Sequence, residues 1–170
     1  MAHTRPTSFL STLAMIDIVM KGDHRFKAEI PLGVDAVAAY IRHRGFPVET
    51  HQCLPDEGAR EIARAGQVEV DVYGFQIEMS NYPSLCAVAA IIRRRKPRAL
   101  IVLGAPCSPS LAAPNIENEP LFDCLVRGAG EQTMLEIMMV VQRGDADLGL
   151  VDGLVGAGRK TTRPERRRAN

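Results

Sequence analysis

Apolar and polar positions along this chain follow two spacings that alternate with each other. Short runs in which most residues are apolar or β-branched are typical of buried strands. Between these runs, apolar residues recur three or four positions apart, as they do on one face of a helix. The pattern predicts five strands, at residues 12–20, 47–52, 68–77, 99–103 and 124–126.

Helices are predicted between the strands from their apolar faces and from their start and stop residues. Asn81 is a good N-cap for the helix that follows it, and Gly45 is a good stop for the helix before it. A proline-rich segment at 107–121 has room only for a short helix. The longer helices are predicted at 34–44, 55–65, 81–96 and 131–141.

Strands that alternate with helices imply parallel pairing, because each crossover helix returns the chain to the same end of the sheet. We therefore predict an α/β fold with helices on both faces. It is a doubly wound five-stranded parallel sheet, flavodoxin-like and Rossmann-like, with strand order 2-1-3-4-5. In this order the first strand is central, and strands 2 and 5 are the two outer strands.

The stretch 122–141 indicates where such a fold would bind a ligand. A short strand is followed by a turn containing Gly128 and Gly130, and Glu131 then opens a helix. Backbone N–H groups at the start of that helix point toward the space above the strand's carboxyl end. Open α/β sheets bind ligands at this end. The loops expected there are 21–26, 76–82, 104–108 and 127–133.

Length and composition favour one globular domain. The 170 residues are divided into an N-terminal arm at 1–11, an α/β domain at 12–157 and a basic tail at 158–170. A net charge of +1 gives no general attraction to nucleic acid or to a membrane. The N-terminal apolar run contains Asp17 and is interpreted as a strand, not as a signal peptide, so a cytoplasmic location is expected. The tail is predicted to be solvated, and docking to a partner or to nucleic acid is its alternative role.

Candidate chemistry carried by single residue types is sparse. The four cysteines are far apart and form no C-x-x-C pair, which is the pattern of reduced thiols and not of a zinc or iron–sulfur site. No Ser/His/Asp or Cys/His constellation stands out, so no catalytic residue and no metal ligand is predicted.

Several consecutive motifs carry a family resemblance over about residues 12 to 158. They are P-L-G at 31–33, D-V-Y-G-F at 71–75, N-Y-P at 81–83, I-V-L-G-A-P at 101–106, V-R-G-A-G-E-Q-T at 126–133 and D-G-L-V at 152–155. In this order and spacing the chain resembles the cobalamin-binding (B12-binding) domain of cobalamin-dependent radical S-adenosylmethionine enzymes.

The resemblance implies a corrinoid held by the loops after strands 3, 4 and 5. The D-x-H-x-x-G motif of histidine-ligated cobalamin proteins is absent, so the cofactor is expected to be base-off without a histidine ligand, and His24 to be a solvated loop residue. Other interpretations stay open: turn formation for the glycines, a helix-dipole charge for Glu131, and packing for Tyr82, Met79 and Cys107. The residues implied to bind the cofactor are Gln76, Glu78, Met79, Ser80, Tyr82, Gly104, Ala105, Pro106, Arg127, Gly128, Gly130, Glu131 and Thr133.

The chain departs from the family at two positions of this expected site. Ala105 stands where the family has the second glycine of G-G-P, and its methyl group would crowd a corrin ring. Ala129 stands where the family has the first glutamate of R-G-E-G-E, which removes a carboxylate. These substitutions favour a cofactor-free module, whereas the retained residues of the second motif favour cofactor binding, namely Arg127, Gly128, Gly130 and Glu131.

The family usually continues into a radical domain with a C-x-x-x-C-x-x-C motif, which these 170 residues lack. The resemblance therefore implies a stand-alone cobalamin-binding-type domain, not catalytic alone, that acts with a separate radical S-adenosylmethionine partner. It would hold or present a corrinoid, or complete the partner's fold. The alternative is an interaction or regulatory module that kept the fold without the cofactor. A weaker third hypothesis is another nucleotide-like or phosphate ligand at the same end of the sheet.

Overall fold

The computed structural model describes residues 11–18, 32–53, 70–77, 81–105, 120–144 and 148–156. Its helices are Leu32–His43 (α1), Tyr82–Arg95 (α3) and Gly130–Gln142 (α5), with a 3-10 turn at Leu148–Leu150 (η1). Its strands are Leu13–Ile18 (β1), Val48–Cys53 (β2), Val72–Gln76 (β3), Leu100–Ala105 (β4), Cys124–Arg127 (β5) and Leu154–Gly156 (β6).

The described strands form one sheet in the order β2-β1-β3-β4-β5-β6. The first five are parallel, which confirms the predicted order 2-1-3-4-5 and the parallel pairing of β3 with β4. The prediction that β5 would be an outer strand is wrong, because β6 pairs with it antiparallel. Gly153, with φ of 81°, reverses the chain, and its carbonyl accepts a hydrogen bond from the Arg127 N–H. A strand of three residues is too short to show a period in the sequence.

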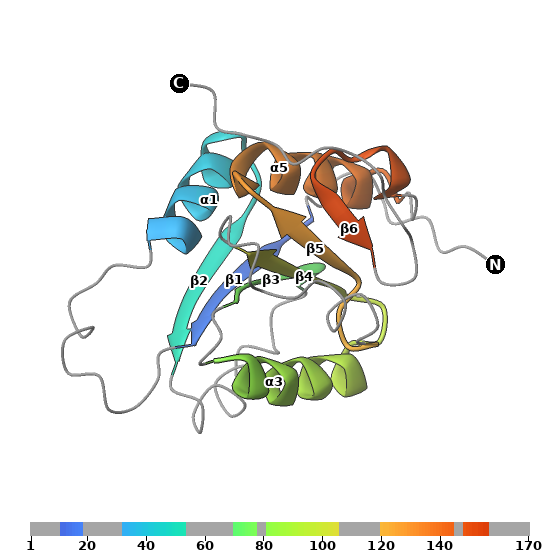
Figure 1. Ribbon diagram of the computed structural model, residues 1–170. Helices are drawn as coiled ribbons and strands as arrows, with labels where there is room; N and C mark the ends of the chain where they lie inside the picture. The colour runs from blue at the N-terminus through green and yellow to red at the C-terminus, as the bar shows by residue number, and fades with distance from the viewer. Residues whose placement is uncertain are drawn as a thin grey trace.

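Helices cover both faces of the sheet, as predicted. In Figure 1, α1 and α5 lie side by side on the upper face and α3 lies on the lower face. The side chains of each strand alternate between these faces. On β1, Leu13 and Met15 join the cluster under α1 and α5, whereas Ala14 and Ile16 join the cluster over α3.

The predicted apolar faces of the helices are confirmed by burial. The apolar face predicted for α3, made of Leu85, Val88, Ala89 and Ile92, is buried, and Gly45 ends α1 with a φ of 89°. Asn81 is the residue before α3, as predicted, but its side chain makes no capping bond. Its amide Nδ2 instead donates to the Gln76 carbonyl at 3.3 Å, so it ties the start of α3 back to the end of β3.

The amino ends of β4 and β5 are joined by one ion pair. Arg93 Nη2 and Asp123 Oδ2 are 2.7 Å apart, and the same Asp123 oxygen accepts the Ile101 N–H at 2.7 Å. The other guanidinium nitrogen of Arg93 donates to the Ala99 carbonyl at 2.9 Å. Arg93 therefore connects the C-terminal end of α3 to the amino ends of β4 and β5. This end of the sheet is opposite the expected ligand site.

Several predictions fall outside the described residues. They are the helix at 55–65, the loop at 21–26, the basic tail, and the short helix within 107–121 except for its last two positions. Within the described residues, no helix is both long enough and apolar enough to cross a membrane.

Candidate functional site

The carboxyl ends of β3, β4 and β5 meet at one end of the sheet, which we call the carboxyl edge. We define it by five residues of the predicted site. Gln76 is in register with Gly104, and Ala105 is in register with Arg127. Gly128 follows directly at the start of the turn into α5. The structure thus brings residues from three predicted loops together, because parallel strands all end at the same side.

No side chain projects from the last-but-one position of β4, at the centre of the carboxyl edge, because that residue is Gly104. A Cβ added to Gly104 would have one near neighbour among the described residues outside the adjacent positions, the Phe75 carbonyl oxygen at 3.5 Å. No described side chain therefore fills the space above Gly104. Gly128 has a φ of 80°, which a side chain would disfavour and which turns the chain from β5 toward α5.

Gly130 has a different role from that of Gly128. It begins α5, and a Cβ there would lie 3.4 Å from Val37 Cγ2 and 3.8 Å from Val126 Cγ1. These are ordinary contact distances in the packing between α1, α5 and β5. A single methyl group would therefore fit at position 130, whereas a larger side chain would meet Val37 and Val126.

Gln76 reaches from the end of β3 toward the first turn of α1. A Cβ added to Gly33 would lie only 2.6 Å from Gln76 Oε1, so the carboxamide lies against the bare backbone of Gly33. Gly33 is exposed and Gln76 is half-buried, so the pair lies at the surface of the edge. Gly33 belongs to the P-L-G motif, which is the signal that could have added it to the candidate site.

Two charged residues lie beside the glycines. Arg127 is half-buried, and its guanidinium forms no recorded hydrogen bond or ion pair with any residue that the structure describes. Glu131 is half-buried in the first turn of α5, where a carboxylate is favoured by the helix dipole. Ala129 is the residue before α5 and offers no side-chain cap to the helix N–H groups.

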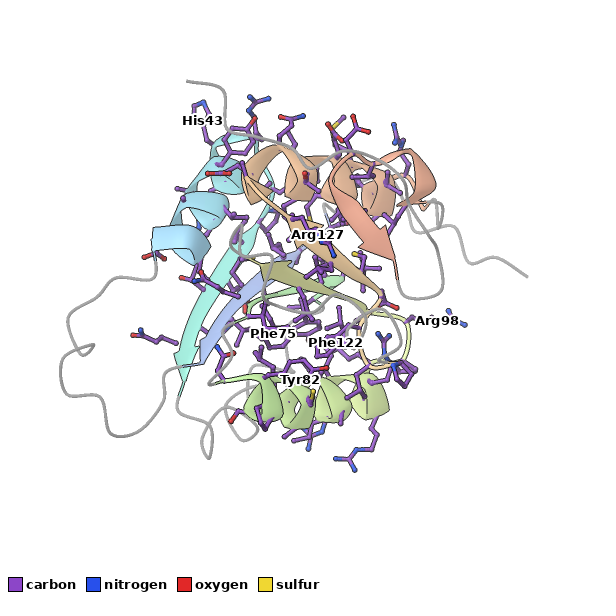
Figure 2. All side chains as sticks on the ribbon, in the orientation of Figure 1. His43, Phe75, Tyr82, Arg98, Phe122 and Arg127 are labelled. Carbon is purple, nitrogen blue, oxygen red and sulfur yellow. The ribbon has the colours of Figure 1, made fainter. Side chains whose placement is uncertain are left out.

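Two predicted site residues are engaged in packing. The Tyr82 ring lies 6.4 Å from the Phe122 ring, and Figure 2 shows both with Phe75 between the sheet and α3. Thr133 is completely buried, and its hydroxyl donates to the Asp152 carbonyl at 3.0 Å. These contacts support the packing interpretation of Tyr82, and they give Thr133 a structural role in fixing the turn before β6.

The remaining predicted site residues are not placed in detail. Glu78, Met79, Ser80 and Pro106 lie outside the described residues, and of Ala105 the structure gives the backbone. Among the described residues, no three His, Cys, Asp or Glu side chains gather as a metal site would require. Cys124 is fully buried, and burial raises the pKa of its thiol, with Asp123 adding to the effect. That thiol therefore stays protonated and is no nucleophile.

Neither histidine in the described residues lies at the carboxyl edge. Figure 2 shows His43 at the last turn of α1, which leads to the opposite end of the sheet. His51 is on the outer strand β2, where its Nε2 is 3.1 Å from Glu49 Oε2. Among the described residues, the carboxyl edge and the start of α5 thus present backbone, the Gln76 carboxamide, the Arg127 guanidinium and the Glu131 carboxylate.

Fold and edge together define a doubly wound α/β domain of the ligand-binding type. The family model of the B12 binding domain matches residues 23–138, which is more than half of the chain. The chain belongs to this family, and it resembles the B12-binding domains found in radical S-adenosylmethionine enzymes.

Two curated relatives match about half of the chain. One is a 2-(S-pantetheinyl)-carbapenam-3-carboxylate methyltransferase of Streptantibioticus cattleyicolor, 30% identical over 83 residues, which are 49% of this chain and 12% of that protein. The other is the cobalamin-dependent radical SAM methyltransferase TokK of Streptomyces tokunonensis, 29% identical over 89 residues, 52% of this chain and 13% of TokK. The chain thus corresponds to a small part of each relative.

A solved structure shares the fold. The cobalamin-dependent S-adenosylmethionine radical enzyme OxsB, with aqua-cobalamin bound, superposes with a TM-score of 0.67 at 13% identity. The match covers 85% of this chain and 20% of OxsB. At this identity the likeness is one of fold.

Proposed function

We propose that this chain binds a cobalamin at the carboxyl edge and works with a separate radical S-adenosylmethionine protein, for which it holds or presents the corrinoid. The observation that carries the proposal is the bare backbone at Gly104, flanked by Gln76 and Arg127, in a domain of the B12-binding family. A broad flat ligand needs such an edge, on which backbone can approach it closely.

The described residues fit a corrinoid better than a metal ion bound directly by the protein. Gln76 offers a donor and an acceptor, Arg127 offers donors, and the first turn of α5 has backbone N–H groups without a side-chain cap from Ala129. A bound cobalamin would supply a cobalt centre that can carry an alkyl group. Ala105, Gly130 and Glu131 complete the part of the proposed site that is described, and Glu78, Met79, Ser80 and Pro106 belong to the proposal from sequence alone.

The cobalt is proposed to have no histidine ligand from this chain. His43 and His51 lie away from the edge, and no D-x-H-x-x-G motif follows β1 in the sequence. The lower face of the corrinoid would then be open or covered by the loop after β3.

A partner is proposed because the relatives' names describe methyltransferases, one of them a cobalamin-dependent radical SAM enzyme. The 170 residues contain no C-x-x-x-C-x-x-C motif, so the cleavage of S-adenosylmethionine would be performed outside them. Size-exclusion chromatography and pull-down from the native host should recover a larger protein with an iron–sulfur cluster. Turnover of a methyl-transfer reaction by this chain alone would contradict the partner role.

Cofactor binding is tested by absorbance. The purified chain is incubated with hydroxocobalamin and desalted, and its visible spectrum is recorded. Retention of about one corrinoid per chain is expected, with strong loss in an Arg127→Ala variant. Arg94→Ala, which changes an exposed arginine on α3, is the matched control and should retain the corrinoid. A colourless wild-type chain after desalting would refute the proposal.

A cofactor-free interaction module is the second candidate function. It is favoured by Ala129, which leaves the start of α5 without a side-chain cap where the family has a carboxylate, and by Ala105. A chain that is colourless after desalting yet binds the same radical partner would establish this role.

A further inference from the structure

The contact between Gln76 and Gly33 lies at a special place in the strand order. The chain leaves β1 toward β2 on one side and returns to β3 on the other, so β1 and β3 flank the point where the order reverses. Ligands of open α/β sheets enter the crevice outside the strand ends at such a point. Gln76 ends β3, and Gly33 is in the first turn of the helix that follows β1.

The backbone of Gln76 is fixed on both sides. Its carbonyl accepts the side-chain amide of Asn81, which is almost completely buried, and the next N–H, of Ile77, donates to the Gly104 carbonyl at 2.9 Å. The side chain therefore starts from a rigid position, and only its own torsions decide where the carboxamide lies.

The carboxamide has room only because Gly33 has no side chain. The 2.6 Å distance from Oε1 to a Cβ added at Gly33 is shorter than any carbon–oxygen contact that a folded protein tolerates, and the added Cβ would lie 3.4 Å from Gln76 Cδ. On the other side of Gln76, in register on β4, Gly104 also has no side chain. Gln76 is thus one polar side chain between two bare backbone positions.

We propose that Gln76 positions the corrinoid by pairing its carboxamide with a peripheral amide of the ring, and that Gly33 is glycine to let it do so. The inference rests on the proposed cobalamin binding. A carboxamide has one acceptor and two donors, which matches the primary amides around a corrin ring in a two-bonded pair. Neither a carboxylate nor an aliphatic side chain can form that pair.

Gln76→Met is the first test, because methionine keeps the length of the side chain and removes its hydrogen bonds. Aquacobalamin is titrated into the full chain and followed by its visible spectrum. We expect Gln76→Met to bind about tenfold more weakly, as the loss of a paired hydrogen bond would cause. Gln142→Leu, at the far end of α5, is the control for loss of a carboxamide and should bind as the wild type does.

Gly33→Ala gives a second, independent test through coupling. The added methyl must displace the Gln76 carboxamide, so this variant should bind about as weakly as Gln76→Met. In the double variant, Gly33→Ala should add nothing, because the carboxamide that it displaces is already gone. Thermal unfolding of each variant checks that the domain stays folded.

The outcomes separate the two proposals. A wild-type chain that binds no aquacobalamin refutes the proposed function itself. If the wild type binds and Gln76→Met binds within twofold of it, cobalamin binding stands and the role of Gln76 is refuted. Additive losses in the double variant also refute it, since they would mean that Gly33 acts without Gln76.

Discussion

The two ends of the sheet are built in opposite ways. At the amino end, charged side chains bond to the backbone of neighbouring strands: Asp123 accepts the Ile101 N–H, and Asp71 accepts the Thr12 N–H at 3.0 Å. At the carboxyl edge, Gly104 is the next-to-last residue of β4 and Gly128 directly follows β5, and among the described residues Asn81 donates a side-chain hydrogen bond to the Gln76 carbonyl. Among the described residues, side chains of the chain itself bond the backbone at the amino end, and glycines stand at the carboxyl edge.

If the proposed ligand binds at the carboxyl edge, this difference separates the end of the sheet that contributes stability from the end that binds the ligand. Polar groups that are hydrogen-bonded within the chain make the amino ends of the strands rigid and are not available to bind a ligand. Bare glycine backbone contributes little to folding stability and leaves space for an external group. Substitutions at the amino end should therefore change stability without changing ligand binding, and those at the carboxyl edge should change binding.

The largest effect is expected from Gly130→Val at the carboxyl edge. The position of the Cβ, 3.4 Å from Val37, leaves no space for two further methyl groups between α1 and α5. The start of α5 must then shift, which should abolish corrinoid retention after desalting and lower the free energy of unfolding by about 1–3 kcal/mol.

Gly130→Ala is the matched variant for this prediction. A single methyl group meets its neighbours at ordinary contact distance, so this variant should fold and retain the corrinoid. If Gly130→Val retains the corrinoid as well, the turn before α5 is not part of the site.

Asp123→Ala should have the converse effect at the amino end. The change removes the partner of Arg93 and the acceptor for Ile101, while Arg93 keeps its bonds to backbone carbonyls. Because both side chains are partly exposed to water, we expect a loss of about 2 kcal/mol in urea-induced unfolding. The affinity for aquacobalamin, measured on the folded variant, should stay within twofold of wild type.

The comparison would fail if Asp123→Ala weakened corrinoid binding as strongly as a change at the carboxyl edge. Asp35→Ala provides the control for loss of an aspartate in the unfolding measurement, and it should change the free energy of unfolding little. Asp35 is in the first turn of α1, where its charge contributes only a few tenths of a kcal/mol, roughly, through the helix dipole.

Tyr73, the second residue of β3, belongs to the buried cluster over α3 and reports on the interior. Burial, with smaller contributions from Glu49 and Asp71, raises the pKa of Tyr73 from 10.0 to about 12. Above pH 10 the unfolded chain loses this proton and the folded chain keeps it, so the free energy of unfolding falls as the pH rises from 10 to 12.

The Tyr73→Phe variant should lack this part of the pH dependence. The difference between the two proteins in urea-induced unfolding should reach about 1 kcal/mol near pH 11, after allowance for partial screening by solvent. Parallel stability curves for wild type and variant would mean that the phenol ionises equally easily in the folded chain.

The sequence predicted those features that depend on neighbouring residues. The apolar face of α3, the stop at Gly45 and the turn at Gly128 are each set within a few residues, and the structure confirms them. The parallel order of β1 to β5 follows from the alternation of elements, which is also visible along the chain.

The features that the sequence did not predict join distant residues. Arg93 and Asp123 are 30 positions apart, and no spacing rule links them. The contact between Gln76 and Gly33 and the packing of Thr133 under Asp152 likewise depend on how the elements are stacked. For the candidate site, strand order predicted the end of the sheet at which Gln76, Gly104 and Arg127 come together, and packing of Tyr82 was an open interpretation, whereas the complete burial of Thr133 was not predicted.

The smallest effect, no change at all, is expected for His24→Ala. His24 lies outside the described residues, and the prediction rests on its sequence neighbours Asp23 and Arg25 and on the absent D-x-H-x-x-G motif. An imidazole ligand must reach within roughly 2.0–2.2 Å of a metal and normally needs a second group to fix its tautomer. The variant should therefore bind aquacobalamin with wild-type affinity and an unchanged visible spectrum, and His51→Ala, on the outer strand, should behave the same way.

A shift of the cobalt spectrum in His24→Ala alone, of the kind that loss of an axial nitrogen produces, would mean that this chain supplies its own cobalt ligand from the loop after β1. The carboxyl edge would then include a side chain that coordinates the cobalt. The two ends of the sheet would no longer differ in how they are built, because side chains would form the bonds at both ends.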